Sequence, residues 1–241
     1  ALLEAIGREI GAGLLRRVLL HRLEAANREA NLYLDILTHD IRNADNVANI
    51  YADILIDELE GEAALHARKL KDGIRKSIEI TTNVATIRKI HESRAGFAPV
   101  DLHAVILDEI THFPDLCIHY DGQHVEVFAD DLLPEVFMNL IGNAVKHGGP
   151  GVEVTVAVED RDEGTVVVTV ADTGPGVDDE AKKAIFFRFE RESGRRGSQG
   201  LGLSICRMLI ARYGGNIWVE DRVPGHPEEG AAFRFTLRKA G

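Results

Sequence analysis

The sequence contains very little cysteine, with only Cys117 and Cys206 among its 241 residues. Two cysteines cannot build a disulfide framework or a cysteine-rich metal site, so we expect both to be small buried hydrophobic residues. No apolar run is long enough to span a membrane, and no stretch has the basic, apolar and small-residue order of a signal peptide. We therefore expect a soluble, cytoplasmic fragment of a larger protein, with no direct membrane insertion.

Positive charge is also scarce relative to negative charge. The chain has 28 Lys and Arg residues against 39 Asp and Glu residues, which gives a formal net charge of −11. A phosphate backbone would be repelled by this charge unless a local basic patch existed, so nucleic acid is not an expected partner. The hydrophobic content of 45% supports a sizeable core, and the length suits one or two domains.

The most informative stretch that is present is His39-Asp40-Ile41-Arg42-Asn43, which lies within a helical pattern. Apolar residues recur around it at steps of three and four, the spacing of a buried helical stripe: Leu34, Leu37, Ile41, Ala44, Ala48, Tyr51, Leu55 and Leu59. At about 100° per residue, His39 lies about 200° from Leu37 and about 160° from Ile41. The pattern therefore predicts that His39 and Asn43 face solvent, away from a heptad-like seam.

Asp40 is one step around the helix from His39. A carboxylate there can hydrogen-bond the imidazole, hold it in one tautomer or accept its proton. The segment would thus display a nucleophilic nitrogen in the open. On these five residues alone, however, an ordinary solvated surface histidine is the better interpretation, because many surface histidines have no catalytic role.

Two long helices joined by a short turn are predicted in this part of the chain. The first runs from about Asn31 to Leu59, and the second from the break at Gly61 to about Ser93. A hairpin of two amphipathic helices buries too little apolar surface alone, so we expect a second copy to complete a dimeric four-helix bundle. The sequence therefore predicts a homodimer.

Three regions follow from these patterns. Residues 1–29 are interpreted as a connecting helix with a polar interruption at His21-Arg22, and residues 30–95 as the helical hairpin. Within the first region, Leu3 to Gly11 resembles the closing helix of GAF sensor domains, although any coiled-coil linker would give a similar pattern. Gly96 as a helix cap and Pro99 as a helix stop separate the hairpin from residues 97–241.

The third region alternates between helical and strand patterns. Helices are predicted at about 102–112 and 132–146, with strands near 117–120, 125–129, 152–158, 166–171, 217–220 and 233–237. Because the strands are mostly antiparallel by this pattern, we expect an α+β two-layer sandwich in which helices cover one face of a sheet.

The first chemical motif of this region is Asn139-Leu140-Ile141-Gly142-Asn143-Ala144-Val145-Lys146-His147. Asn139 and Asn143 share a helix face, and their amide oxygens are suitable ligands for a magnesium ion that is also bound by phosphates. Lys146 can meet phosphate as a point charge, and His147 ends the same turn. A polar helix face with a capping lysine is an equally good interpretation of this motif alone.

Two glycine-containing motifs follow. Asp172-Thr173-Gly174-Pro175-Gly176 comes directly after a strand, where the carboxylate could accept a hydrogen bond from an exocyclic amine such as that of adenine, although an ordinary turn would look the same. Gly197 to Ser204 opens a helix whose free amides can bind an anion, without the lysine of a Walker motif. The intervening residues 178–196 carry Phe186, Phe187 and Phe189, which suits either a nucleotide lid or a flexible surface loop.

Taken together, these motifs resemble sensor histidine kinases of two-component systems over residues 30–241. The resemblance assigns an N box around Asn139 and Asn143, a G1 box at 172–176, an F-box-like segment at 185–189 and a G2 box at 200–202, in family order. The preceding helix resembles the dimerisation and phosphotransfer domain, with His39 at the phosphoacceptor position. The sequence departs from the commonest pattern in having Ala44-Asp45-Asn46 where the family often has a proline, and Ser198 in place of a frequent glycine.

The resemblance implies a histidine-kinase type ATPase sandwich and autophosphorylation of His39 by Mg²⁺-ATP, followed by transfer to an aspartate of a response regulator. Asp40 and Asn43 would assist, with Asn43 also positioning water for a regulator phosphatase activity. Asn139 and Asn143 would bind Mg²⁺. The implied ATP-binding residues are Asn139, Asn143, Lys146, His147, Asp172, Gly174, Gly176, Phe189, Gly200, Leu201 and Gly202. Two alternatives stay open: an ATP-binding dimeric scaffold without phosphoryl transfer, and a Bergerat-fold ATPase or serine kinase.

Overall fold

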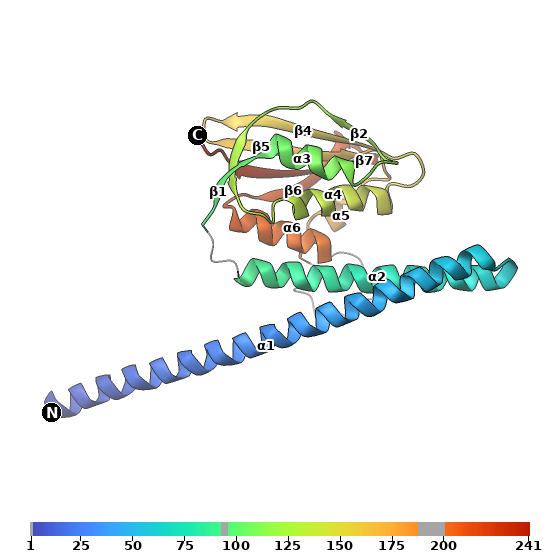
Figure 1. The fold of residues 1–241 in the computed structure, drawn as a ribbon. Helices are drawn as coiled ribbons and strands as arrows, with labels where there is room; N and C mark the ends of the chain where they lie inside the picture. The colour runs from blue at the N-terminus through green and yellow to red at the C-terminus, as the bar shows by residue number, and fades with distance from the viewer. Residues whose placement is uncertain (1, 93–95, 188–200) are drawn as a thin grey trace. The chain divides into compact units, whose positions relative to one another are not determined.

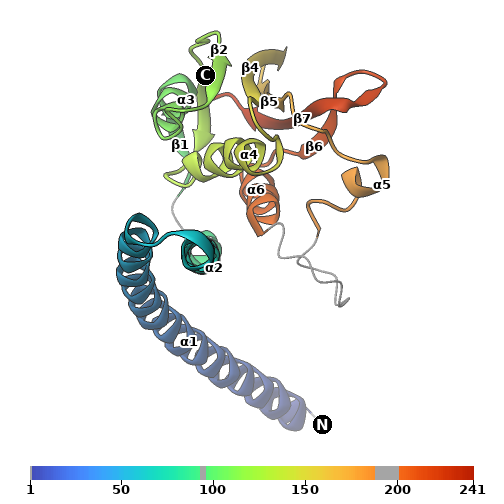
Figure 2. The ribbon, with the colours of Figure 1, turned by 90° about the vertical axis from the view of Figure 1, so that its right-hand side faces the viewer.

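The structure is a computed structural model that describes residues 2–92, 96–187 and 201–241. The chain divides into two compact units, residues 1–88 and 89–241, which we describe separately. Figures 1 and 2 show long helices in the first part of the chain and a layered arrangement of helices and strands in the second. Within the described residues, no helix is both long and apolar enough to cross a membrane.

The first unit is a helical hairpin made by α1 (Leu2–Glu58) and α2 (Gly61–Glu92). Gly61 has a φ of 61°, a left-handed conformation that favours glycine and lets the chain reverse between the helices. Ion pairs Lys71–Asp53 and Arg88–Asp35 connect α2 to α1 at two levels. The turn and the cross-links together fix the two helices antiparallel.

The helix that carries His39 is longer than predicted. The structure has one continuous helix from Leu2 to Glu58, so the predicted interruption at His21-Arg22 and the separate start near Asn31 are wrong. The sequence contains neither glycine nor proline between Gly13 and Gly61, and polar side chains alone do not interrupt the backbone hydrogen bonds of a helix.

The apolar stripe of α1 is exposed within a single chain, and its burial by a second copy stays a prediction. Leu37 is 56% exposed, Ile41 45% and Tyr51 64%. Among the α1 residues whose burial is described, Ala52 is buried, and it lies on a different side of the helix from Tyr51. The stripe is therefore available to a partner outside this hairpin.

The second unit contains a five-stranded sheet in the order β2-β4-β5-β7-β6, with helices on one of its faces (Figure 2). Its strands are β2 (Cys117–Tyr120), β4 (Glu153–Asp162), β5 (Thr165–Asp172), β6 (Ile217–Val223) and β7 (His226–Arg238). The helices are α3 (Leu102–Thr111), α4 (Pro134–His147), the short α5 (Asp179–Lys182) and α6 (Leu201–Arg212). This architecture is the expected α+β sandwich.

Alternation along the strands explains why one face of the sheet is covered. Val154, Val156 and Val158 of β4 are buried, whereas the alternate residues Glu153 and Thr155 are exposed. The core lies between the buried face and the helices, where the rings of Phe137 on α4 and Phe235 on β7 meet edge to face at 5.7 Å.

A second, two-stranded sheet was not predicted. It pairs β1 (Ala98–Asp101) with β3 (Glu126–Ala129) in antiparallel register. Pro99 was interpreted only as a helix stop, but a proline is tolerated on an edge strand. Asp101 then begins α3, because its Oδ1 accepts hydrogen bonds from the backbone amides of His103 and Ala104 at 2.9 and 3.4 Å.

Buried polar contacts and the two cysteines complete the second unit. Asp130 accepts hydrogen bonds from Arg212 Nη2 at 2.7 Å and from the hydroxyl of Tyr213 at 2.6 Å, which ties the loop before α4 to the end of α6. Cys206 is buried on α6, but Cys117 is exposed on β2. The expectation that both cysteines are buried is therefore wrong for Cys117.

Candidate functional site

The two amides of the 139–147 motif lie on α4 and differ in their partners. Asn139 is half-buried, and its Nδ2 donates to the backbone carbonyl of Glu135 at 2.7 Å. This bond holds the Asn139 side chain against its own helix. Asn143 has a buried Nδ2 that makes no hydrogen bond. A buried N–H donor without a hydrogen-bond partner lowers the stability of the ligand-free protein. Its presence indicates a place where a ligand can supply the missing acceptor.

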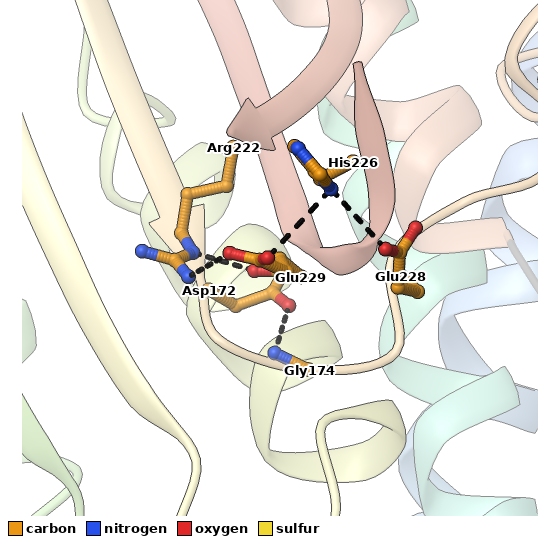
Figure 3. Close-up of polar contacts among 6 residues, drawn as sticks. All are labelled: Asp172, Gly174, Arg222, His226, Glu228 and Glu229. Atoms are coloured by element: carbon orange, nitrogen blue, oxygen red, sulfur yellow. Dashed lines mark hydrogen bonds and ion pairs between the residues drawn. The ribbon is translucent and has the colours of Figure 1, made fainter. Parts of the chain in front are cut away.

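Asp172 is the last residue of β5 and is only 9% exposed. The backbone N–H of Gly174 donates to its Oδ1 at 2.9 Å (Figure 3). Burial raises the pKa of Asp172 above its ordinary value, and backbone hydrogen bonds from Gly174 and Ala231, with smaller effects of the Arg222 and His147 charges, partly offset that rise. The carboxyl is therefore a fixed, partly desolvated acceptor at the end of a strand.

Glycines bring the separate motifs into contact. A Cβ on Gly174 would lie 2.7 Å from the Cα of Gly148, directly after α4. A Cβ on Gly202 would lie 2.2 Å from Oδ1 of Asn139. At Gly174 the Cβ would meet backbone, so the close approach requires glycine there; at Gly202 it would meet the end of the Asn139 side chain, which would have to move. The three motifs thus converge on one region of the second unit.

The hairpin between β6 and β7 forms another boundary of this region, and the sequence did not predict it. A Cβ on Gly176, whose φ is 73°, would lie 1.7 Å from the carbonyl oxygen of Pro227. A Cβ on Gly230 would lie 1.9 Å from the carbonyl oxygen of Asp172. The hairpin therefore packs directly on the loop that carries Asp172. The available signal was the turn-forming sequence Pro224-Gly225 between two strand patterns.

Charged side chains of the same hairpin surround Asp172 in Figure 3. Arg222 donates from Nε to the backbone carbonyl of Glu229 at 2.6 Å, and its Nη2 lies 3.9 Å from the Glu229 carboxylate. His226 lies 3.4 Å from the carboxylate of Glu228 and 3.8 Å from that of Glu229. These contacts keep the Arg222 side chain near the Asp172 carboxyl.

The start of the predicted lid is attached to the sheet. Phe186 is buried and its ring meets that of Phe233 on β7, while Lys182 of α5 pairs with Asp221 of β6 at 2.5 Å. Phe186 is therefore a core residue. Arg207 stacks over the ring of Phe187, with 3.7 Å to the ring centroid.

The remaining predicted ATP-site residues fall into two groups. Lys146 and His147 are exposed in the last turn of α4, and Leu201 is the half-buried first residue of α6. The predicted residues Phe189 and Gly200 lie outside the described residues.

The histidine motif of the first unit has the geometry expected of a displayed nucleophile. The side chain of His39 is 73% exposed and that of Asp40 is 70% exposed. The Nδ1 of His39 lies 3.0 Å from Oδ1 of Asp40, and Nδ2 of Asn43 lies 3.4 Å from both ring nitrogens. The Asp40 contact favours the tautomer with the proton on Nδ1, which leaves the lone pair on Nε2.

The residues of the second unit fit a nucleotide with a divalent cation. They supply neutral amide oxygens on α4, a lysine in its last turn, a buried carboxyl on β5 and glycines packed closely against Asn139 and Asp172. Amide oxygens suit Mg²⁺ that is also held by phosphates. The unsatisfied N–H donor of Asn143 suits a phosphate oxygen of such a nucleotide.

Comparison with known proteins identifies the second unit independently. The family described as "Histidine kinase-, DNA gyrase B-, and HSP90-like ATPase" matches residues 129–241. The curated protein "Adaptive-response sensory kinase SasA" of Crocosphaera subtropica is 45% identical over 115 residues, which are 46% of this chain. The match covers 29% of that relative's length, so the chain spans less than a third of it.

Solved structures resemble both the second unit and a longer part of the chain. The catalytic domain of the histidine kinase ThkA is 32% identical, with a TM-score of 0.50 over 59% of this chain and 97% of that domain. ThkA in complex with the response regulator TrrA covers 85% of this chain and 60% of that one, at 27% identity and a TM-score of 0.56. The match to full-length ShkA in complex with AMPPNP covers 86% of this chain and 46% of the ShkA chain. Its sequence identity is 27% and its TM-score is 0.58.

Proposed function

This chain belongs to the histidine kinase family, and on that premise we propose that it binds Mg²⁺-ATP between α4, β5 and α6 and transfers the γ-phosphoryl group to His39. The observation that carries the proposal is the coexistence of two sites in one chain. One is the converging set of Asn139, Asp172 and Gly202, and the other is the exposed imidazole held by Asp40.

ATP recognition follows from the donors and acceptors that these three motifs supply. The carboxylate of Asp172 accepts a hydrogen bond from the exocyclic amine of adenine, and Gly174 and Gly176 allow the backbone to approach the flat ring. The free amides at the start of α6, near Leu201 and Gly202, bind phosphate oxygens together with the positive end of the helix. Lys146 and His147 add positive charge beside the phosphates.

Asn143 and Asn139 would hold the Mg²⁺ ion through their amide oxygens. When bound, this ion neutralises charge on the phosphate oxygens and makes the γ-phosphorus a better acceptor of electrons. The chain's own contribution is to fix the amides: Asn139 is anchored by its bond to the carbonyl of Glu135. The Mg²⁺ assignment rests on the oxygen-ligand chemistry of the two amides. The unsatisfied Nδ2 of Asn143 is a donor, which suits a phosphate oxygen.

In phosphoryl transfer the protein mainly positions the nucleophile in line with the leaving oxygen and neutralises charge on the phosphate oxygens. The Nε2 lone pair of His39 forms the new nitrogen–phosphorus bond while the bond from the γ-phosphorus to the bridging oxygen breaks, and ADP leaves with that electron pair. The imidazole ring becomes positively charged as the bond forms. Asp40, 3.0 Å from Nδ1, stabilises this charge and accepts the Nδ1 proton.

We also propose that the phosphotransfer unit is a homodimer, because the exposed stripe of α1 needs a partner. Leu37, Ile41, Tyr51 and Leu55 are all more than a third exposed within one chain. Pairing two such stripes in a four-helix bundle would remove them from water. Sedimentation equilibrium should show a dimer that Leu37→Asp dissociates, whereas Leu107→Asp on the exposed side of α3 should leave it intact. Monomeric wild-type chain would contradict the dimer.

The receiver of the phosphoryl group is proposed to be a response-regulator aspartate. ThkA was solved in complex with such a regulator, TrrA, and that structure covers 85% of this chain. Asn43, within 3.4 Å of the His39 ring, could hold water for the reverse, phosphatase activity on the regulator. A cytoplasmic location suits this function and the two free thiols.

Incubation with γ-³²P-labelled Mg²⁺-ATP tests the main proposal. Wild type should acquire acid-labile, alkali-stable label, His39→Ala should acquire none, and His66→Ala, which removes an exposed histidine of α2, should label normally. Label that survives His39→Ala would refute the assignment. ATP binding without label would indicate the scaffold alternative, and acid-stable label or phosphate release without label would indicate a serine kinase or an ATPase.

A further inference from the structure

A cluster of three different metal-ligating side chains lies on the uncovered face of the five-stranded sheet. Cys117 and His119 are two residues apart on β2, so their side chains project from the same face. β2 is an edge strand that pairs in parallel with β4, and Glu153 of β4 lies directly opposite Cys117. All three residues are exposed. The strand register therefore places a thiol, an imidazole and a carboxylate together.

The distances between the potential ligand atoms match those around a tetrahedral metal ion. Cys117 Sγ lies 3.5 Å from His119 Nε2, which lies 3.5 Å from Glu153 Oε2. All three atoms lie within 4.8 Å of one another. Tetrahedral Zn²⁺ with its usual bond lengths places ligand atoms about 3.3–3.8 Å apart. The Glu153 side chain is exposed, so its carboxylate can adjust to the geometry of a bound ion.

The backbone beneath the cluster is held in place on both sides. The amide of Glu153 donates to Oγ1 of Thr173 at 2.9 Å, and the amide of Thr173 donates to the carbonyl of Glu153 at 3.0 Å. On the other side, parallel pairing runs from Cys117–Glu153 to Tyr120–Val156. The ligand atoms therefore start from fixed strand positions, so that binding a metal requires side-chain adjustment only.

We propose that Cys117, His119 and Glu153 form a binding site for Zn²⁺ or a chemically similar divalent ion, with water in the fourth position. The donor set decides the class of metal. Thiolate and imidazole select a borderline-soft ion over Mg²⁺ or Ca²⁺, which prefer oxygen ligands. The thiolate and the carboxylate together balance the double positive charge of the ion.

A second cluster, His226 with Glu228 and Glu229, is less suited to a metal. It lacks a thiol, and the Glu229 carboxylate lies 3.9 Å from the guanidinium of Arg222, whose positive charge opposes a cation. This cluster provides a matched control, because it offers an exposed histidine and carboxylates without the Cys117 sulfur.

The test is metal titration of the whole chain after treatment with a chelator and without nucleotide, since ATP itself binds Zn²⁺. Isothermal titration calorimetry measures Zn²⁺ binding, and Co²⁺ reports ligand type through its thiolate charge-transfer absorption. We expect one Zn²⁺ per chain, and a loss of affinity on the order of 100-fold in Cys117→Ser and in His119→Ala, with a smaller loss in Glu153→Gln. His226→Ala should bind as wild type does. All substituted residues are exposed, and urea unfolding checks each fold.

The spectroscopic result separates this site from adventitious binding. The Co²⁺ complex of wild type should show thiolate absorption that Cys117→Ser abolishes and His226→Ala preserves. The proposal is wrong if wild type binds no Zn²⁺, if Cys117→Ser and His119→Ala bind it with wild-type affinity, or if His226→Ala is the variant that loses binding. None of these outcomes depends on phosphorylation of His39.

Discussion

Replacing Gly202 with alanine should separate nucleotide binding from stability. The substitution keeps the backbone N–H at the start of α6 and adds only a Cβ, which would lie 2.2 Å from Oδ1 of Asn139. An unstrained contact needs the Asn139 oxygen to move by roughly 1 Å, a misplacement that can cost about 100-fold in a positioned site. The Asn139 amide can move only by weakening its 2.7 Å bond to the carbonyl of Glu135.

The effect on stability should be small because two contributions oppose each other. Weakening one hydrogen bond lowers the free energy of unfolding by about 1 kcal/mol. Replacing glycine with alanine in a helix raises it by up to about 1 kcal/mol. The free energy of unfolding should therefore stay within about 1 kcal/mol of wild type. Gly73→Ala provides the matched control, since a Cβ on this exposed glycine of α2 meets no atom within 4 Å.

Calorimetric titration with Mg²⁺-ATP and urea unfolding measure the two quantities on the same samples. We expect Gly202→Ala to weaken Mg²⁺-ATP binding by about 10- to 100-fold with nearly unchanged unfolding, and Gly73→Ala to bind ATP as wild type does. Wild-type ATP affinity in folded Gly202→Ala would refute the inference that Asn139 contacts the bound nucleotide or its ion.

Substitutions at Asp172 and Asp130 should change the free energy of unfolding in opposite directions. Because burial raises the pKa of Asp172, its carboxyl should protonate at a higher pH than an ordinary aspartate, and ATP affinity measured by titration should fall at correspondingly milder acidity. Because folding penalises the charged form of Asp172, Asp172→Asn should raise the free energy of unfolding at neutral pH. This gain in stability should disappear as the pH falls through the raised pKa. The same substitution should lower ATP affinity about 10-fold or more. Asp130→Ala should lower the free energy of unfolding by about 3 kcal/mol, as measured by urea titration, because it leaves Arg212 and Tyr213 without their shared buried acceptor. Asp131→Ala, at the exposed neighbouring residue, should change it little.

Local sequence patterns predicted the elements that carry the main motifs. The helix of Asn139 and Asn143 and the strand that ends at Asp172 were expected near their observed positions, because periodicity and turn residues are local signals. His39 was also expected to face solvent, and its side chain is exposed, as are those of Leu37 and Ile41 within one chain. In each case the sequence near the residue contains the information.

The features that were missed depend on contacts between distant residues. Periodicity indicated an apolar stripe on α1, which is exposed within one chain, but periodicity does not identify the partner that covers it. The pairing of Pro99 with Phe128 in the small sheet, and the packing of Gly230 on the Asp172 carbonyl, are set by tertiary register. The Cys117 and Glu153 side chains likewise meet only through the pairing of β2 with β4.

The central claim is that His39 is the residue phosphorylated, through the nitrogen that faces away from Asp40. Heteronuclear NMR of the ¹⁵N-histidine-labelled chain after incubation with Mg²⁺-ATP identifies both the residue and the nitrogen. Because Nδ1 lies 3.0 Å from the Asp40 carboxylate, we expect a phosphorus–nitrogen coupling to Nε2 of His39. Phosphorylation at Nδ1 would contradict the role given to Asp40, and phosphorylation of any other residue would contradict the account as a whole.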